Sequence, residues 1–343
     1  MDEFEQYIKQ GEPEEKERSI IWQTAIGLQE VDGLKPSKYL IETAKANIEG
    51  NITIDEVKRR LESYYEEMPV KNAERTEEAD KVSARITEIL SEKTFHFSPL
   101  ELQEIHRRLF DVVLPKLAGK IRDYNITKKE WVLDDDTVSY VSFNMIKTAL
   151  EYDFNEEKKF DYKPLSLKEK VEHIIKFVSG VWQIHPFGEG NTRTTAVFTI
   201  KYLRTFGFNV DNDSFANNSW YFRNALVRAN YTNFVKNVYA TQEYLNRFFD
   251  NLLFDGKNEL HNKDLLIGTV NDTVGTVNGT VKLTAEEKIK AVIRGNANIT
   301  AGIIATTLSM GLRTVKRYLK TLKDNGEVER IGSDKNGYWK VKK

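Results

Sequence analysis

Apolar residues recur at helical spacing along most of this chain, in stretches bounded by residues that begin and end helices. The segment SIIWQTAIGLQEV repeats apolar side chains three and four residues apart, and PSKYLIETAKANIEG begins at a Ser37 cap and ends at Gly50. Such spacing places apolar side chains on one face of a helix. The chain is therefore predicted to be mainly α-helical, with short helices that pack through their apolar faces.

The composition of the chain excludes several classes of protein. At 343 residues it is longer than one typical domain. It has no apolar run near the roughly 18 residues that a membrane span needs, so no membrane partner is expected. The N-terminal MDEFEQYIKQGEPEEKERS lacks the basic and apolar regions of a secretory signal, and the chain has no cysteine. We therefore expect a cytoplasmic protein without disulfides or thiolate metal sites.

Two segments depart from the helical pattern. In KIRDYNITKKEWVLDDDTVSYV, β-branched and aromatic residues flank a polar LDDDT tip, which predicts an exposed hairpin or flap. The segment GTVNDTVGTVNGTV, residues 268–281, lacks large core residues and is typical of a linker or a two-stranded arm. A domain boundary is expected there.

The sequence after this boundary predicts a small basic domain. Three short helical patterns precede EVERIGSDKNGYWKVKK, in which two strands flank residues 334–337. Three helices followed by a hairpin form a winged helix-turn-helix. Residues 283–343 contain 13 lysine and arginine residues against 6 aspartate and glutamate residues, in a chain whose net charge is -1. This asymmetry raises the question of a nucleic-acid partner.

The stretch IHPFGEGNTR, between two helical patterns, combines a candidate base with an anion pocket. Its two glycines lead into a helix near Asn191 and expose consecutive backbone N–H groups at the positive helix end. Arg193 adds a forked cation suited to phosphate oxygens, and Glu189 can hold a Mg²⁺ ion that bridges a diphosphate. His185 ends the preceding helix and can take a proton from an attacking hydroxyl group. Such a pocket would fit a nucleotide.

Each of these features alone is more often structural than catalytic, but here they occur together and in order. HPFGEGNTR resembles the signature of the Fic family, H-x-F-x-(D/E)-G-N-(G/x)-R, and the resemblance extends to AGKIRDYNI and to the helices from about residue 95 to 254. Members of this family transfer AMP from ATP to a hydroxyl group of a target protein, and a few use other nucleotides or transfer a phosphate. The resemblance implies a Mg²⁺-dependent nucleotidyltransferase, a protein adenylyltransferase with ATP as its substrate.

The resemblance also implies roles for single residues. His185 would be the general base, Phe187 the buried anchor of the loop, and Glu189 the Mg²⁺ ligand. Arg193 would hold the nucleotide phosphates while the α-phosphate is attacked. The hairpin at residues 128–141 would hold a segment of the target by strand pairing. The expected nucleotide-binding residues are Phe187, Glu189, Gly190, Asn191, Thr192, Arg193, Tyr221 and Asn230.

Two positions depart from the commonest form of the signature. Thr192 replaces a glycine, and Ala196 replaces a second arginine that would bind a γ-phosphate. The chain would then use another cation, such as Arg223 or Arg228, or another nucleotide. These departures support an alternative function, a DNA-binding regulator whose Fic core senses a nucleotide without turnover. Retention of His185 favours the enzyme, because a sensor needs no base.

An acidic residue at the end of an N-terminal helix predicts an inhibitory contact. Glu49 precedes the Gly50 cap, where a negative charge opposes the helix dipole. The stretch is similar to the inhibitory helix of antitoxins of Fic proteins, (S/T)-x-x-x-E-(G/N), although Lys45 stands at the Ser/Thr position. The resemblance implies that Glu49 pairs with Arg193, or with an arginine of a later helix, and excludes the productive nucleotide. The alternative is an ordinary helix end.

In the basic domain, LRTVKRYLKTL stands at the position of a recognition helix. Its cations suit DNA phosphates, although winged helices also bind proteins. The expected DNA-binding residues are Arg313, Lys316, Arg317 and Lys320.

The predicted fold is mainly α, a Fic-type helical core with a small β-hairpin flap and a C-terminal winged helix-turn-helix. Its predicted parts are an N-terminal helical segment with the inhibitory helix at residues 1–92, the Fic core at 93–260, a linker at 261–282 and the winged-helix domain at 283–343. The expected partners are a target protein with a hydroxyl side chain and DNA. The oligomeric state is left open, with a homodimer as one alternative.

Overall fold

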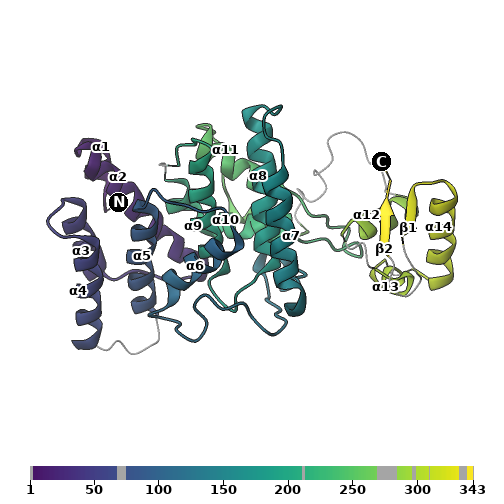
Figure 1. Cartoon of the computed structure of the whole chain (residues 1–343), viewed down its shortest axis with the longest axis horizontal. Helices are drawn as coiled ribbons and strands as arrows, with labels where there is room; N and C mark the ends of the chain where they lie inside the picture. The colour runs from purple at the N-terminus through teal and green to yellow at the C-terminus, as the bar shows by residue number, and fades with distance from the viewer. Residues whose placement is uncertain are drawn as a thin grey trace. The chain divides into compact units, whose positions relative to one another are not determined.

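The computed structural model describes residues 3–67, 75–210, 213–268, 284–295, 299–308, 310–331 and 338–342. The chain divides into two compact units, Met1–Asn230 with Thr241–Leu266, and Tyr231–Ala240 with Ile267–Lys343. Both are mainly helical, as the spacing of apolar residues predicts (Figure 1). No helix in the described ranges is both long enough and apolar enough to span a membrane.

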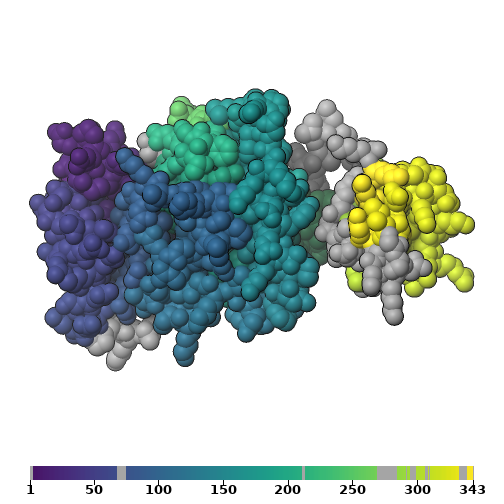
Figure 2. Space-filling view, viewed as in Figure 1, coloured from purple at the N-terminus to yellow at the C-terminus, as the bar shows by residue number. Residues whose placement is uncertain are grey.

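The first unit consists of α-helices joined by turns and short 3-10 helices (η). Its α-helices are α1 (Glu5–Gln10), α2 (Pro13–Gly27), α3 (Lys38–Ile48), α4 (Ile54–Glu67), α5 (Thr76–Ser91), α6 (Pro99–Phe110), α7 (Ile146–Lys159), α8 (Leu167–Ile184), α9 (Asn191–Thr205), α10 (Ser214–Ala229) and α11 (Glu243–Leu253). Its 3-10 helices are η1 (Leu28–Asp32), η2 (Trp131–Leu133), η3 (Phe143–Met145) and η4 (Asn262–Leu265). Figure 2 shows the N-terminal helices in one continuous body with the segments that follow them.

Among its described residues, the second unit has three helices followed by two strands, the order of a winged helix. They are α12 (Ala285–Gly295), α13 (Ala301–Thr307), α14 (Leu312–Asp324), β1 (Val328–Ile331) and β2 (Tyr338–Val341). The strands pair antiparallel, with Val328 opposite Val341. An apolar core joins the three helices to β1. The predicted turn at residues 334–337, residues 269–282 of the predicted linker and residue 283 lie outside the described residues.

The helix start that the sequence predicts at Ser37 is confirmed by a side-chain cap, and α6 begins with the same kind of cap at Ser98. The Ser37 hydroxyl accepts a hydrogen bond from the N–H of Leu40 at 3.0 Å, and Ser98 accepts one from the N–H of Glu101 at 3.0 Å. Gly50, at a left-handed φ of 77°, follows the end of α3. Each cap satisfies a backbone group that the helix leaves unbonded.

The predicted hairpin at residues 128–141, here called the flap segment, is a loop rather than a pair of strands. A backbone hydrogen bond joins its arms, from the N–H of Glu130 to the carbonyl of Asp136 at 2.9 Å, and η2 forms between them. Asp134 and Asp135 of the polar tip are exposed, as expected, but the apolar residues Val132 and Leu133 beside them are fully buried. Because these side chains pack into the unit, the segment folds onto it and does not form a free strand pair.

Helix α9 lies in the interior of the first unit. It packs against α5, α6 and α8, and every residue from Asn191 to Leu203 is buried. The ring of Phe198 lies 5.6 Å from that of Phe154 and 5.2 Å from that of Phe95, in edge-to-face arrangements. A helix covered on all sides carries the polar residues of its first turn into the interior as well.

The last turn of α9 caps the end of α5. Lys201 Nζ donates hydrogen bonds to the carbonyls of Ile89 and Glu92, both at 2.9 Å. Arg204 Nη1 donates to the carbonyl of Leu90 at 2.6 Å. Cations at a helix C-terminus satisfy its unbonded carbonyls and complement its dipole. The two helices are therefore tied together at this end by side chains of α9.

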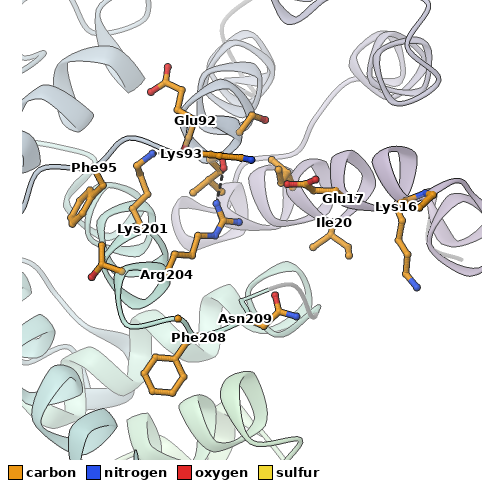
Figure 3. Close-up of a pocket in the computed structure, with 16 residues that line it drawn as sticks. Lys16, Glu17, Ile20, Glu92, Lys93, Phe95, Lys201, Arg204, Phe208 and Asn209 are labelled. Atoms are coloured by element: carbon orange, nitrogen blue, oxygen red, sulfur yellow. Dashed lines mark hydrogen bonds between the residues drawn. The ribbon is translucent and has the colours of Figure 1, made fainter. Parts of the chain in front are cut away.

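A cavity of about 840 Å³ lies beside this junction. Figure 3 shows Lys201 and Arg204 on one side of it and Glu17 and Ile20, from α2, on the other. Both of these cations donate to the carbonyls at the end of α5, and the residues around His185 do not line the cavity.

Candidate active site

The stretch that carries the sequence motif is a tight loop between α8 and α9. His185 ends α8 in the left-handed region, with φ 52° and ψ 60°. Gly190 begins α9 at a φ of 71°, and a Cβ atom there would lie 2.4 Å from the ring of Phe110. Only glycine fits this position. The first turn of α9, whose N–H groups have no intrahelical acceptor, begins at Asn191, soon after α8 ends at Ile184.

The His185 side chain is 2% exposed. Its Nδ1 lies 3.3 Å from the carbonyl of Trp182, so Nδ1 carries the proton and Nε2 carries a lone pair. Nε2 is buried and has no hydrogen-bond partner among the described residues. Burial lowers the pKa of His185 well below 6.5, and the positive charge of Lys128 acts in the same direction. The imidazole is therefore a neutral base at neutral pH.

A second histidine fixes the middle of the loop. The His106 ring stacks on Phe187, with centroids 3.8 Å apart. Its Nδ1 accepts from the N–H of Gly119 at 2.8 Å, so Nε2 donates to the carbonyl of Glu189 at 3.0 Å. Burial lowers the pKa of His106 to about 4, which keeps this tautomer neutral. Phe187 is thus the buried anchor that the sequence predicts.

The side chains that follow Phe187 hold the loop together. Asn191 Nδ2 donates to the carbonyl of Phe187 at 2.7 Å, and its Oδ1 accepts from the N–H of Phe187 at 3.0 Å. Thr192 Oγ1 accepts from the indole N–H of Trp182 at 3.0 Å. Both side chains therefore help to hold the loop.

Arg193 lies in the interior rather than at an open pocket. Its Nη2 lies 2.8 Å from Asp32 Oδ2, an ion pair without hydrogen-bond geometry, and 2.8 Å from Glu78 Oε1. Its Nη1 donates to Gln29 Oε1 at 3.1 Å, and the ring of Phe110 lies 4.8 Å from the guanidinium carbon. The side chain has no solvent-exposed surface. The residue expected to hold phosphates thus joins α9 to η1 and α5.

The predicted pairing of Glu49 with Arg193 is not formed in the structure. Glu49 is exposed, and its carboxylate accepts hydrogen bonds from Tyr7 Oη and, at 3.0 Å, from Asn51 Nδ2. The physical reason is packing: α1 to α4 share an apolar cluster of their own, so the end of α3 faces α1. Glu78 and Asp32 occupy the position beside Arg193 instead.

Glu189, the predicted Mg²⁺ ligand, has a partly exposed side chain. Its carboxylate is one of the charges that act on Arg75. Burial lowers the pKa of Arg75, but the hydrogen bond to Glu78 and the charges of nearby carboxylates, including that of Glu189, raise that pKa. No cluster of three or more metal-ligating side chains occurs in the described part of the chain. A single carboxylate fits Mg²⁺, which takes one or two carboxylates and fills its other positions with water and substrate phosphates.

The residues expected beside the base and sugar of a nucleotide lie on helix α10. Asn230 ends this helix and donates to the carbonyl and hydroxyl oxygens of Ser179 on α8. Tyr221 is buried, and burial raises the pKa of its hydroxyl, on which Arg247 and Tyr244 of α11 and Asp264 of η4 also act. Tyr221 therefore faces α11 and η4, and Asn230 fastens α10 to α8.

Of the two alternative cations, only Arg223 lies near His185. Arg223 Nη1 lies 2.7 Å from a carboxylate oxygen of Glu130 in the flap segment, and its charge contributes to lowering the pKa of His185. Arg228 instead donates to the carbonyl of Leu265 at 2.7 Å, away from the motif. Lys128 also contributes to lowering the pKa of His185, and its ammonium forms no ion pair with any described residue.

The arrangement joins a neutral base to a helix N-terminus in a fixed loop. Over residues 96–203 the chain matches the family model described as the Fic/DOC family. Residues 96–203 form a Fic/DOC domain. The Fic family is known for AMPylation-type transfer, which is a transferase activity.

Two solved structures resemble the chain at low identity. The N-terminal FIC domain of Bep8, a VirB-translocated effector of Bartonella sp. 1-1C, is 19% identical over 57% of this chain and 85% of that one, with a TM-score of 0.38. A Fic family protein from Desulfovibrio desulfuricans G20 is 12% identical over 99% of this chain and 94% of that one, with a TM-score of 0.46. No curated protein sequence matches the chain.

The sequence did not identify the residues outside the motif that hold the loop between α8 and α9. They are His106, the acidic partners of Arg193, and Arg122, whose side chain donates to the carbonyl of His185 at 2.8 Å. Arg122 belongs to AGKIRDYNI, a stretch that carries part of the family resemblance, and this was the only signal for it. The others carry no sequence signal, because their role arises from contacts between distant segments.

The buried cluster around Arg193 predicts a large loss of stability when the arginine is removed. Arg193→Ala should lower the free energy of unfolding of the first unit by about 2–5 kcal/mol, because it removes a fully buried side chain, leaves the buried Glu78 with Arg75 as its ion-pair partner, and takes the ion pair from the partly exposed Asp32. Urea unfolding followed by tryptophan fluorescence measures this change. Arg59→Ala, which removes a 77% exposed side chain, is the control and should change stability by less than ~1 kcal/mol. Equal stabilities of the two variants would contradict a structural role for Arg193.

Proposed function

We propose that the chain is a Mg²⁺-dependent protein adenylyltransferase, which transfers AMP from ATP to a hydroxyl side chain of a target protein. The observation that carries this proposal is the buried, neutral imidazole of His185, whose Nε2 has no partner among the described residues. A buried polar atom without a partner costs free energy, so its retention beside a helix N-terminus suggests a role in binding or catalysis. A pure nucleotide sensor has no use for such a base.

In the proposed reaction, Nε2 of His185 takes the proton of the target hydroxyl group. The hydroxyl oxygen forms a bond to the α-phosphorus while the bond from that phosphorus to the pyrophosphate oxygen breaks. The backbone N–H groups at the start of α9 would bind phosphate oxygens. Glu189 would hold Mg²⁺, which neutralises charge on the leaving phosphates when bound.

The positive charge for the phosphates has to come from outside the motif on this proposal. Ala196 carries no charge, and Arg193 is fully buried against Asp32 and Glu78. Lys128, which forms no ion pair with a described residue, and Arg223, which pairs with Glu130 but is not fully buried, lie near enough to His185 to influence its pKa. We infer that these two side chains stabilise charge on the transferred nucleotide, although neither belongs to the signature.

Changing His185 to alanine tests the proposal directly. His185→Ala should abolish transfer of label from α-labelled ATP to proteins of a cell lysate or to the chain itself, because no other group accepts the hydroxyl proton. Nucleotide affinity, measured in parallel by equilibrium binding, should stay within about threefold, because the base does not hold the phosphates. His261→Ala, which changes a 51% exposed histidine, is the matched control and should keep full activity. Undiminished labelling by His185→Ala would remove the base from the mechanism.

The depressed pKa of His185 predicts the pH dependence of transfer. The base is active when neutral, so the rate should be constant at high pH and fall as the pH drops through the pKa of the folded protein. Because burial places this pKa well below 6.5, transfer at pH 6.5 should exceed half of its plateau. Initial rates from pH 4.5 to 8, with ATP affinity measured at each pH, give the profile. A half-maximal rate above pH 6.5 would contradict the buried neutral base.

A second proposal concerns the winged helix, which we infer binds DNA. The side chains of α14 that the sequence singles out, Arg313, Lys316, Arg317 and Lys320, are all exposed. None of them forms an ion pair with a described residue, so all four charges are available to phosphates. This role is compatible with the enzyme and is also the central feature of the alternative, a regulator with a non-catalytic Fic core.

Salt dependence distinguishes DNA binding from a protein-interaction role. The full chain should bind duplex DNA with an affinity that falls steeply with salt, and changing the four α14 cations to alanine should reduce the slope of log affinity against log salt by about 3 to 4. Fluorescence anisotropy at several salt concentrations measures both slopes. A control with the same loss of charge changes four exposed lysines of the first unit, Lys147, Lys158, Lys163 and Lys168. Equal slopes for wild type and the α14 variant would leave the module a protein-binding role.

A further inference from the structure

One buried guanidinium close to His185 makes its contacts without an acidic partner. Arg122 is 5% exposed, and no carboxylate among the described residues lies within ion-pair distance of it. Burial lowers its pKa, yet an arginine stays charged in a protein. A buried charge is tolerated only when hydrogen bonds satisfy its donors. The hydrogen-bond partners of Arg122 therefore indicate which parts of the structure it stabilises.

Those partners are backbone carbonyls from two parts of the site. Nε donates to the carbonyl of His185 at 2.8 Å, and Nη2 reaches that of Ile184 at 3.3 Å. Both carbonyls belong to the end of α8, where no intrahelical donor is available and a cation complements the helix dipole. The backbone N–H of Arg122 also donates to the carbonyl of Pro186 at 2.9 Å. One residue thus binds three consecutive carbonyls, centred on His185.

This contact set explains how His185 holds an unusual backbone conformation. A residue with a Cβ atom at φ 52° is disfavoured by about 1 kcal/mol or more, and the strain persists only where the surroundings over-determine it. The three carbonyls that flank this conformation are the ones bonded to Arg122. The direction of the imidazole, and so of its free Nε2, depends on that backbone geometry.

The other contacts of Arg122 reach the flap segment. Nη1 donates to the carbonyl of Tyr124 at 2.6 Å, just before the segment, and Nη2 donates to the carbonyl of Val141 at its end. The guanidinium group of Arg122 therefore bonds both to the two ends of the flap region and to the end of α8. A lysine has no such fork and could not serve both sets of carbonyls.

We propose that Arg122 is the positioning residue for His185, and that it ties the flap segment to the base through shared backbone contacts. The catalytic consequence of this inference rests on the proposed function. The positioning of His185 by Arg122 does not depend on the proposed function. Arg122 touches neither Nε2 nor the motif side chains that would meet a nucleotide. Its loss should therefore misdirect the base while leaving the nucleotide pocket in place.

The first test separates turnover from binding. Arg122→Lys keeps the charge but loses the fork, and it should lower kcat for transfer by about 10- to 100-fold, the effect of a misplaced reacting group. KM for ATP should stay within about threefold. Arg204→Lys is the matched control, because Arg204 also donates to a carbonyl at a helix C-terminus, that of α5, and should leave both constants unchanged. Arg122→Gln, checked by circular dichroism, serves as a second variant should the lysine variant not fold.

The second test does not depend on transferase activity. Diethyl pyrocarbonate modifies accessible neutral imidazoles, and peptide mass spectrometry reports the rate at each histidine. In Arg122→Lys the modification of His185 should rise several-fold, while that of His106, buried in the same unit, should stay as in wild type. Arg204→Lys should change neither rate. The exposed His261 serves as the internal reference for reagent activity.

The outcomes distinguish this inference from the proposed function. A rise at His185 alone supports the positioning role, even where wild type shows no transfer and the proposed function fails. Unchanged His185 reactivity would overturn it, whatever happens to kcat. Equal rises at His185 and His106 would also overturn it, because they would mean general loosening of the fold. An equal loss of kcat in Arg204→Lys would show that any lost cap slows the enzyme.

Discussion

The buried ion cluster around Arg193 determines how the N-terminal segment and the motif helix fit together. A guanidinium without solvent requires compensating charge, and it receives Asp32 and Glu78 from two different N-terminal elements. Arg75 adds a second positive charge through its hydrogen bonds to Glu78, at 2.8 Å each. Two arginines therefore balance two carboxylates. The N-terminal segment cannot leave α9 without leaving unpaired buried charges behind, which explains why both parts belong to one compact unit.

Three other cations of this unit donate hydrogen bonds to carbonyls at helix C-termini. Lys201 and Arg204 satisfy the last carbonyls of α5, and Arg122 satisfies those of α8. A helix end left without donors inside a protein would cost the full desolvation penalty of its carbonyls. These contacts fix where each helix stops and so fix the loop that follows. At α8 the loop that follows is the motif, so the cap there has a consequence for chemistry as well as for stability.

Helices, caps and the motif loop could be predicted from the sequence because their signals are local. Ser37, Gly50 and Gly190 act through their own backbone conformation and their nearest neighbours. The partners of charged side chains could not be predicted in the same way. Glu49 ends its helix as expected, yet the packing of α1 to α4 turns it toward Tyr7, and Arg193 pairs with carboxylates more than 100 residues away in sequence. Likewise, the β-branched and aromatic residues of the flap segment predict a hairpin, but burial of Val132 and Leu133 decides its form.

Some side chains in and around the motif have hydrogen-bond partners and one does not, and this difference indicates what the signature does in this chain. Asn191, Thr192 and His106 form hydrogen bonds that hold the loop. At His185, by contrast, Nε2 has no partner in the described part of the chain. Most side chains of the motif thus hold the loop in place, between the imidazole of His185 and the N-terminus of α9. Because Arg193 is held in a buried ion cluster, charge complementary to phosphates would have to come from outside the signature, and Lys128 of the flap segment and Arg223 of α10 lie outside it. On that reasoning the replacement of the second signature arginine by Ala196 does not by itself argue against turnover, because the residues that would bear the charge lie outside the signature.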